Sequence, residues 1–384
     1  MRYYKLKSDF TKKEKRDFVI NNILELRKGM RAKIPEKNLD KNLLIATWNI
    51  RDFDSNKFGH GPRLKESFYY IAEIISAFDL VAVQEVNKDL RAFNRLMYLL
   101  GPDWDFITTD VTEGKSGNSE RMTFIYDVRR VSFKNIAGEI VLPKNRLIRG
   151  DIQFARTPFV VSFQAGWTKF NLCTVHIYFG SDYGDKMKRR KSEIAGIAKF
   201  LKSRADKNKE NLIVLGDFNI TNPEHETMKA LTDNGFRIPD QIKERPVGTN
   251  TWQSKHYDQI GVRSKTEYFQ MGNKSNSAGA FFFFEHVLTE EQFDDYKEHA
   301  AASLTKQKVN KEKDLAREEN KANPDPRKIE KLKKAINEFN DEINDPVKLK
   351  DYYYRLWKTF QVSDHMPMWT ELIVDHSEKY LNNI

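Results

Sequence analysis

Seven short apolar runs, each ending in polar residues, recur between Leu43 and Val262 and constrain the fold more than any other feature of the chain. Runs of this length, bounded by polar residues, are typical of strands buried in a sheet. Amphipathic helical stretches lie between some of the runs, at 65–78 and 188–202. The runs are Leu43–Thr47, Leu80–Val83, Met122–Tyr126, Val160–Phe163, Phe170–Val175, Leu212–Leu215 and Gln259–Val262. The alternation predicts a mixed α/β domain with packed sheets.

The N-terminal segment, residues 1–40, has a different pattern. Phe18, Ile23, Leu26 and Met30 follow the spacing of one helical face. Because residues three or four apart share a face of a helix, this spacing predicts an amphipathic helix that packs on the main body. We therefore expect an N-terminal helical extension before the α/β domain.

The composition changes at Thr289, and Lys, Glu, Asp, Asn and Ala dominate the next sixty or so residues. Within them, apolar residues from Ile329 to Ile343 follow a three–four spacing typical of a helix seam, and Asn323–Pro326 would break the preceding helix. We predict a helical hairpin over 289–357, inserted into a catalytic domain formed by 41–288 and 358–384. Two interpretations stay open: a solvated packing arm, or an arm that binds a protein partner or clamps substrate.

Net charge, cysteine content and the lengths of the apolar runs indicate which partners and which cellular compartment to expect. Lys and Arg outnumber Asp and Glu by 65 to 55, and the net charge of +10 favours polyanions such as nucleic acid, although charge that serves only solubility accounts for it equally well. Cys173 is the only cysteine, which excludes an intramolecular disulfide and favours a cytoplasmic location. No apolar run resembles a signal peptide or a bilayer span, so no membrane association is expected.

Side chains suited to catalysis stand where the apolar runs end. Any one of them alone is more often a cap or a satisfied hydrogen-bond partner. Their joint occurrence is more informative, because an oxygen-rich set of carboxylates and amides suits a hard cation such as Mg²⁺. The oxygen-bearing residues are Asn49, Glu85, Asp217, Asn219 and Asp364, and His176 and His365 accompany them.

The motifs around these residues resemble the successive signatures of the endonuclease/exonuclease/phosphatase superfamily. Further segments resemble deoxyribonuclease I, and the resemblance covers about 43–288 and 360–373. It implies an α/β fold of four layers, in which two packed mixed sheets are flanked by helices, and it makes Phe281–Phe284 a core strand. The motifs are Trp48–Arg51, Gln84–Val86, Glu120–Arg121, Arg156–Pro158, Gly216–Asn219, Tyr257–Asp258, Ala280–Phe283 and Ser363–His365.

The resemblance also implies a metal site and a water-activating group. Glu85, helped by Asn49, would hold Mg²⁺ or Mn²⁺, and Asp364 would place a further carboxylate near the metal. Asp217 would orient or activate water, with Asn219 beside it. Such a metal would neutralise charge on the scissile phosphate and polarise it for attack.

Histidines and arginines complete the implied machinery. His176 and His365 would contact phosphate oxygens and move protons, and each needs an acidic partner to set its tautomer. Glu120 resembles the partner of His176, and Asp258 resembles the partner of His365. Two arginines, at 51 and 156, would grip phosphate oxygens.

We therefore predict a metal-dependent phosphodiesterase that cleaves a nucleic-acid backbone, with DNA favoured. The alternatives are a phosphatase or phospholipid phosphodiesterase of the same superfamily, and a partner-dependent nucleic-acid-binding protein. Asn87 and Asn118 stand where deoxyribonuclease I places an arginine and a tyrosine in the DNA minor groove. Minor-groove reading of that kind is therefore not expected here.

Overall fold

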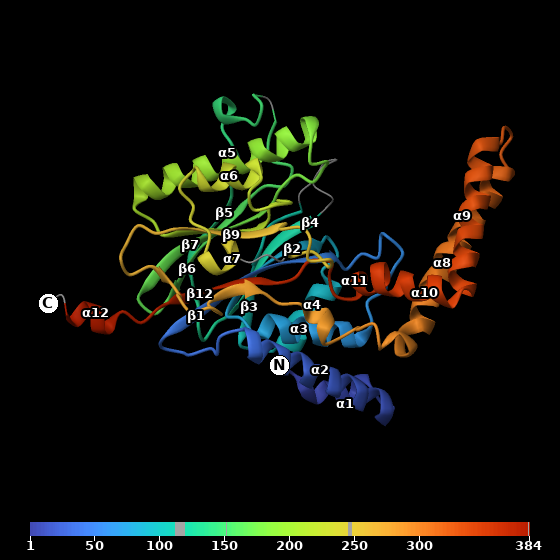
Figure 1. The fold of residues 1–384 in the computed structure, drawn as a ribbon, viewed down its shortest axis with the longest axis horizontal. Coiled ribbons are helices and arrows are strands. Elements are labelled where there is room, and N and C mark those ends of the chain that lie inside the picture. The colour runs from blue at the N-terminus through green and yellow to red at the C-terminus, as the bar shows by residue number, and fades with distance from the viewer. Residues whose placement is uncertain (112–119, 151, 245–247, 383) are drawn as a thin grey trace.

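Two mixed β-sheets pack face to face at the centre of the protein (Figure 1), whose computed structural model describes residues 1–111, 120–150, 152–244, 248–382 and 384. The first sheet contains β1 (Asn42–Phe53), β2 (Leu80–Asn87), β3 (Trp104–Thr108), β4 (Glu120–Asp127), β10 (Gln270–Met271), β11 (Ala278–Ala280) and β12 (Met368–Ile373). Its order is β10-β12-β1-β2-β4-β3, and β11 also pairs with β12. The pair β1 and β2 is parallel and the other pairs of this sheet are antiparallel.

The second sheet is built from consecutive strands in the order β5-β6-β7-β8-β9. They are β5 (Ser132–Glu139), β6 (Phe159–Ala165), β7 (Thr168–His176), β8 (Leu212–Asp217) and β9 (Asp258–Arg263). Only β7 and β8 run parallel. All seven apolar runs predicted to be strands lie within strands of these two sheets. Side chains from the facing sheets meet directly: the Gln84 amide on β2 donates to the Thr174 hydroxyl on β7 at 2.8 Å.

Helices cover both outer faces and give the predicted four layers (Figure 1). One face carries α3 (Lys65–Ser76) and α4 (Arg91–Leu100), and the other carries α5 (Gly184–Asn208) and α6 (Glu226–Thr232). The N-terminal helix α2 (Lys13–Lys33) packs on α3 and buries Ile23 and Leu26. The short helices are α1 (Leu6–Asp9), α7 (Asp240–Lys243) and α12 (Ser377–Leu381).

Two local predictions were wrong. The first strand does not end at Thr47 but continues to Phe53, so Asn49 and Arg51 lie inside β1. Phe281–Phe284 is not a strand, because β11 ends at Ala280 and a 3-10 turn spans Phe283–Glu285. Phe281, Phe282 and Phe283 are still buried, and the Phe283 ring lies 5.7 Å from the ring of Trp48. Burial of the rings therefore does not require extended backbone.

Residues 289–357 form a helical arm that leaves the body beside α11 (Figure 1). The helices are α8 (Phe293–Glu319) and α9 (Pro326–Asn344), followed by α10 (Pro346–Tyr352), a π-helical turn (Tyr353–Trp357) and α11 (Lys358–Gln361). Tyr296, Tyr353 and Trp357 are buried together at the root of the arm. No helix in the described ranges combines the length and apolar character that a bilayer crossing requires.

Candidate active site

The candidate site begins at one end of the second sheet, where three neighbouring strands carry ionisable side chains at the same register. His176 is the last residue of β7, Asp217 the last of β8 and Asp258 the first of β9. His176 is paired with Asp217 across one ladder, and Asp217 with Asp258 across the next. Directly paired residues in adjacent strands point their side chains to the same face of the sheet. The three side chains therefore share one face.

Asp217 is the centre of this group. Its Oδ2 atom lies 3.5 Å from His176 Nε2 and 3.8 Å from His365 Nε2. The same oxygen accepts a hydrogen bond of 3.1 Å from the side-chain amide of Asn49, which comes from the opposite sheet. The other oxygen accepts a 2.9 Å hydrogen bond from the backbone N–H of Asn219. The carboxylate is thus held between two imidazoles in a site that both sheets build.

Asn219 is hydrogen-bonded to Asp217 through its backbone. Its φ is 53°, and this left-handed conformation directs its backbone N–H at the Asp217 carboxylate. Its side-chain amide donates to the carbonyl of Ile177 at 2.8 Å. The structure therefore shows Asn219 orienting Asp217 and tying the end of β7 to the end of β8.

His365 is backed by a fully buried carboxylate. Its Nδ1 atom lies 2.8 Å from Asp258 Oδ2, and Asp258 has no exposed surface. The hydroxyl of Thr249 donates to the same oxygen at 2.7 Å. Burial raises the pKa of Asp258. Burial alone would lower the pKa of His365, but the charges of Asp258 and Asp217 outweigh it and raise that pKa well above its ordinary value.

His176 is backed in the same way by Glu120, the first residue of β4. The Nδ1 atom of His176 lies 3.4 Å from Glu120 Oε2. Arg156 Nε donates to that same oxygen at 2.9 Å, and the Lys57 ammonium lies 3.9 Å from the other oxygen. Burial alone would raise the pKa of Glu120, but these three neighbours hold it well below its usual range. Arg156 is itself buried, so in this structure it anchors Glu120.

Glu85 and Asn49 form the part of the site that could hold a metal. The Asn49 amide donates to Glu85 Oε1 at 3.0 Å, and the backbone N–H of Asp52 donates to Glu85 Oε2 at 2.9 Å. The side-chain amide oxygen of Asn49, Oδ1, is buried without a hydrogen-bond partner. A buried, unpartnered amide oxygen beside two carboxylates is a donor set that fits a hard divalent cation.

Asp364 is turned toward Arg51, with which it forms an ion pair of 3.2 Å. The guanidinium of Arg51 also donates to Thr359 at 2.7 Å and stacks on the Phe360 ring at 3.9 Å. Within the described ranges, no three Asp, Glu, His or Cys side chains gather into a metal-binding cluster. A cation held by Glu85 and Asn49 would therefore have to complete its shell with water and substrate oxygens.

Sequence reasoning did not assign roles to Ser363 and Asp52. The Ser363 hydroxyl donates to the backbone carbonyl of Asn49 at 2.6 Å and accepts a hydrogen bond from the backbone N–H of His365 at 3.0 Å, so it ties the histidine loop to β1. Ser363 stands inside the quoted Ser-Asp-His motif, which was the available signal. The Asn87 amide lies 3.5 Å from Asp52, and Asn118 falls outside the described residues.

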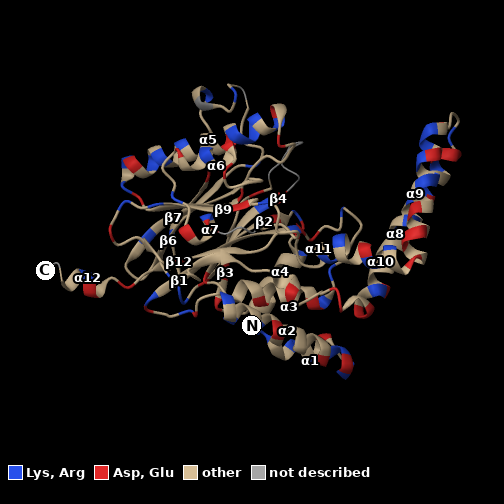
Figure 2. Cartoon of the chain, in the orientation of Figure 1, with Lys and Arg blue, Asp and Glu red and all other residues tan. Residues whose placement is uncertain are grey.

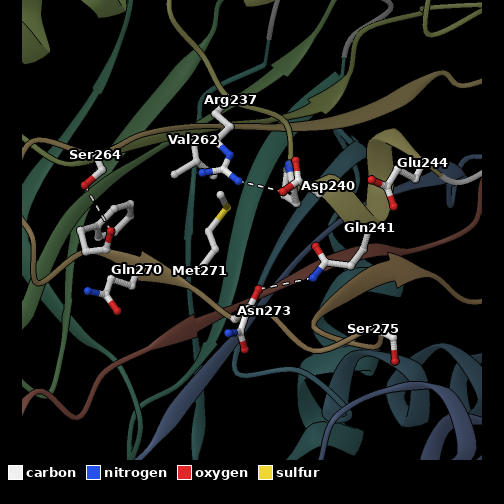
Figure 3. A pocket seen from close by; sticks show the side chains of 13 residues that line it. Arg237, Asp240, Gln241, Glu244, Val262, Ser264, Gln270, Met271, Asn273 and Ser275 are labelled. Atoms are coloured by element: carbon white, nitrogen blue, oxygen red, sulfur yellow. Dashed lines mark hydrogen bonds and ion pairs between the residues drawn. The ribbon is translucent and has the colours of Figure 1, made fainter.

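The molecule also contains a cavity of about 700 Å³ away from this site (Figure 3). An ion pair of 2.8 Å between Arg237 and Asp240 lies on its wall, opposite Met271. None of the predicted site residues lines it. The histidine–carboxylate cluster, and not this cavity, carries the groups needed for phosphate chemistry.

Comparisons with known proteins agree with the fold. No curated protein matches the chain. An endonuclease/exonuclease/phosphatase family protein from Bacteroides thetaiotaomicron aligns with 88% of this chain and 100% of its own, at 14% identity and a TM-score of 0.50. The mannosyl-6-phosphatase Bt3783 from B. thetaiotaomicron aligns with 62% of this chain and 90% of its own, at 17% identity and a TM-score of 0.47. The structure of D. rerio TDP2 complexed with single-strand DNA product aligns with 62% of this chain and 90% of its own, at 15% identity and a TM-score of 0.44. The model of the Endonuclease/Exonuclease/phosphatase family matches residues 46–263, more than half of the chain, which therefore belongs to this family of phosphate-ester hydrolases.

Proposed function

We propose that this protein is a divalent-metal-dependent phosphodiesterase that hydrolyses a nucleic-acid backbone, with DNA as the favoured substrate. One observation carries the proposal: the Asp217 carboxylate lies between two imidazoles, 3.5 and 3.8 Å away, and each imidazole is backed by a buried carboxylate. Paired acid–base groups around one carboxylate are the arrangement expected for moving protons at a phosphate ester.

The roles of the side chains follow from their positions. Asp217 orients the attacking water and takes up its proton. His176 and His365 present their Nε2 atoms toward Asp217, so they would donate to the phosphate oxygens and to the leaving oxygen. Glu120 and Asp258 hold the imidazole tautomers through the opposite ring nitrogens. A cation held by Glu85 and Asn49 would neutralise charge on the phosphate and polarise it.

Residues at the rim of the site favour a nucleic acid as the phosphate-ester substrate. Trp252 is half exposed on a loop whose preceding residue, Thr251, donates its backbone N–H to the carbonyl of Asp364 at 2.9 Å. Arg355 lies over the Trp252 ring at 5.7 Å. An exposed aromatic ring beside a cation is a surface on which unpaired bases stack. The net charge of +10 favours the same polyanion.

A substrate panel tests the proposal. The purified protein with Mg²⁺ or Mn²⁺ is offered supercoiled plasmid, single-stranded DNA, RNA, an abasic duplex, phosphoinositides and sugar phosphates. We expect hydrolysis of nucleic acid that Asp217→Asn abolishes. Asp206→Asn is the matched control, because Asp206 is an exposed, ion-paired acid on α5 and not part of the site. Hydrolysis confined to phosphoinositides or sugar phosphates would replace the proposal with a phosphatase.

A further inference from the structure

The distal half of the helical arm is strongly basic. Between residues 306 and 334 the chain has eleven Lys and Arg against six Asp and Glu, which makes up half of the protein's net charge of +10. Figure 2 marks Lys and Arg positions in blue along the outer parts of α8 and α9, away from the two sheets. The segments next to the body, 290–305 and 335–352, carry more acids than bases. The excess positive charge is therefore concentrated at the end of the arm.

Basic side chains of this segment line a groove of about 690 Å³ between α8 and α9. Leu332 contributes to its wall and is buried. Glu318, which is nearly fully covered, pairs with Lys321 at 2.8 Å and Lys328 at 2.6 Å. Two further lysines line the groove, Lys311 and Lys331, and within the described ranges neither has a carboxylate within 4.0 Å. The groove, which is also lined by Asp314, thus offers two cations that form no ion pair within the described part of the chain.

The root of the arm is fixed to the candidate site. Thr359 and Phe360, in α11, both contact Arg51, and the chain then continues directly into Ser363 and His365. The ring of His60 also packs on Phe360, with 4.5 Å between centroids. The contacts at the root therefore fix the arm to the candidate site.

The reach of the arm can be compared with the length of a substrate. Beyond Leu304, the last residue of the buried face of α8 near the body, the helix continues for another fifteen residues to Glu319. At a rise of about 1.5 Å per residue, this part of the helix is about 22 Å long. A duplex advances about 3.4 Å per base pair, so this length of helix corresponds to about six or seven base pairs.

We propose that the groove lined by Lys311 and Lys331 binds the phosphate backbone of the nucleic-acid substrate at a distance from the scissile bond. This inference rests on the proposed function, because it assumes that the substrate is a nucleic acid. It makes the arm a second, sequence-independent contact that favours long substrates over short ones. A polyanion with regularly spaced charges fits the excess of cations, whereas a small anion would need only one of them.

The test compares K311Q/K331Q with a matched control, K199Q/K207Q, which removes the same charge from exposed positions on α5. Binding to a labelled 30-base-pair DNA is measured in chelator over a range of salt concentrations. Loss of two phosphate contacts should lower the salt slope by about 1.8 and the affinity at 0.1 M salt by at least about tenfold. Hydrolysis of the p-nitrophenyl ester of thymidine monophosphate, too short to reach the arm, should be unchanged. Circular dichroism and melting temperature check that the variants fold alike.

The outcomes separate this inference from the proposed function. If the p-nitrophenyl ester is hydrolysed but K311Q/K331Q binds the long duplex within twofold of the control, the arm does not bind the substrate and the inference is overturned. If the control K199Q/K207Q loses as much affinity for the duplex, the effect comes from overall charge, and the inference is overturned as well. If the unaltered protein hydrolyses no nucleotide ester of any length, the proposed function fails first.

Discussion

Replacing Asp258 with asparagine isolates the charge that backs His365. In the structure, Asp258 Oδ2 accepts from both His365 and Thr249, while Oδ1 is buried without a partner. The asparagine carbonyl can therefore keep both hydrogen bonds, and its NH₂ replaces the oxygen that already has none. The change removes the negative charge and leaves the geometry in place. Leaving a buried donor unsatisfied costs about 1–3 kcal/mol of stability.

The size of the effect on catalysis follows from the kind of hydrogen bond that is lost. A hydrogen bond to a charged group contributes about 1.5–3 kcal/mol and a neutral one about 0.5–1.5 kcal/mol, a difference of about 1–1.5 kcal/mol. Since 1.36 kcal/mol corresponds to about tenfold, Asp258→Asn should lower turnover about tenfold. His365→Ala removes the proton-transfer group itself and should lower turnover about a hundredfold or more.

A double-mutant cycle supplies the decisive assay. Turnover is measured for Asp258→Asn, His365→Ala and the double variant, each normalised to folded protein from its melting curve. If Asp258 acts through His365, the asparagine should have almost no effect once the histidine is gone. An undiminished tenfold loss in the His365→Ala background would refute the pairing. A large loss of stability with unchanged turnover would make the pair purely structural.

Four further predictions concern other parts of the molecule. Chelation should abolish activity, and Glu85→Gln should raise the Mg²⁺ needed for half-maximal rate by at least about tenfold in a metal titration; activity in excess chelator would contradict this. His176→Ala should lower kcat about a hundredfold with little change in KM, and a fully active, stable variant would exclude a catalytic role. Burial and the charge of Arg51 lower the pKa of His60 to about 4. The folded state thus binds fewer protons than the unfolded state, and unfolding free energy should fall as pH drops from about 6.5 to 4, less so in His60→Gln; equal urea midpoints across this window would refute it. Trp357→Ala should cost about 3–5 kcal/mol in urea unfolding, because the ring is buried at the arm root, and a cost below 1 kcal/mol would show a loosely packed root.

Much of the fold was readable from the sequence, because strands buried between layers need nearly continuous apolar residues. The runs from Leu43 to Val262 show this and all lie in strands. Two boundaries were not readable. Asn49 and Arg51 look like loop residues, yet they lie in β1, because this strand continues to pair with β2 at Asn49 and Phe53. Phe281–Phe284 looked like a strand because a short apolar run does not distinguish extended from coiled backbone.

The sequence by itself determined which chemical groups stand at the strand ends: the carboxylates, the amides and the two histidines, in an order that resembles one superfamily. The resemblance also implied the pairs Glu120–His176 and Asp258–His365, but only the tertiary structure brings these side chains within contact distance. Asp258 and His365 are 107 residues apart and meet because two sheets pack and β9 pairs with β8. The same packing turned Arg156 toward Glu120. Such contacts depend on the three-dimensional register of strands and loops, which no local pattern of residues encodes.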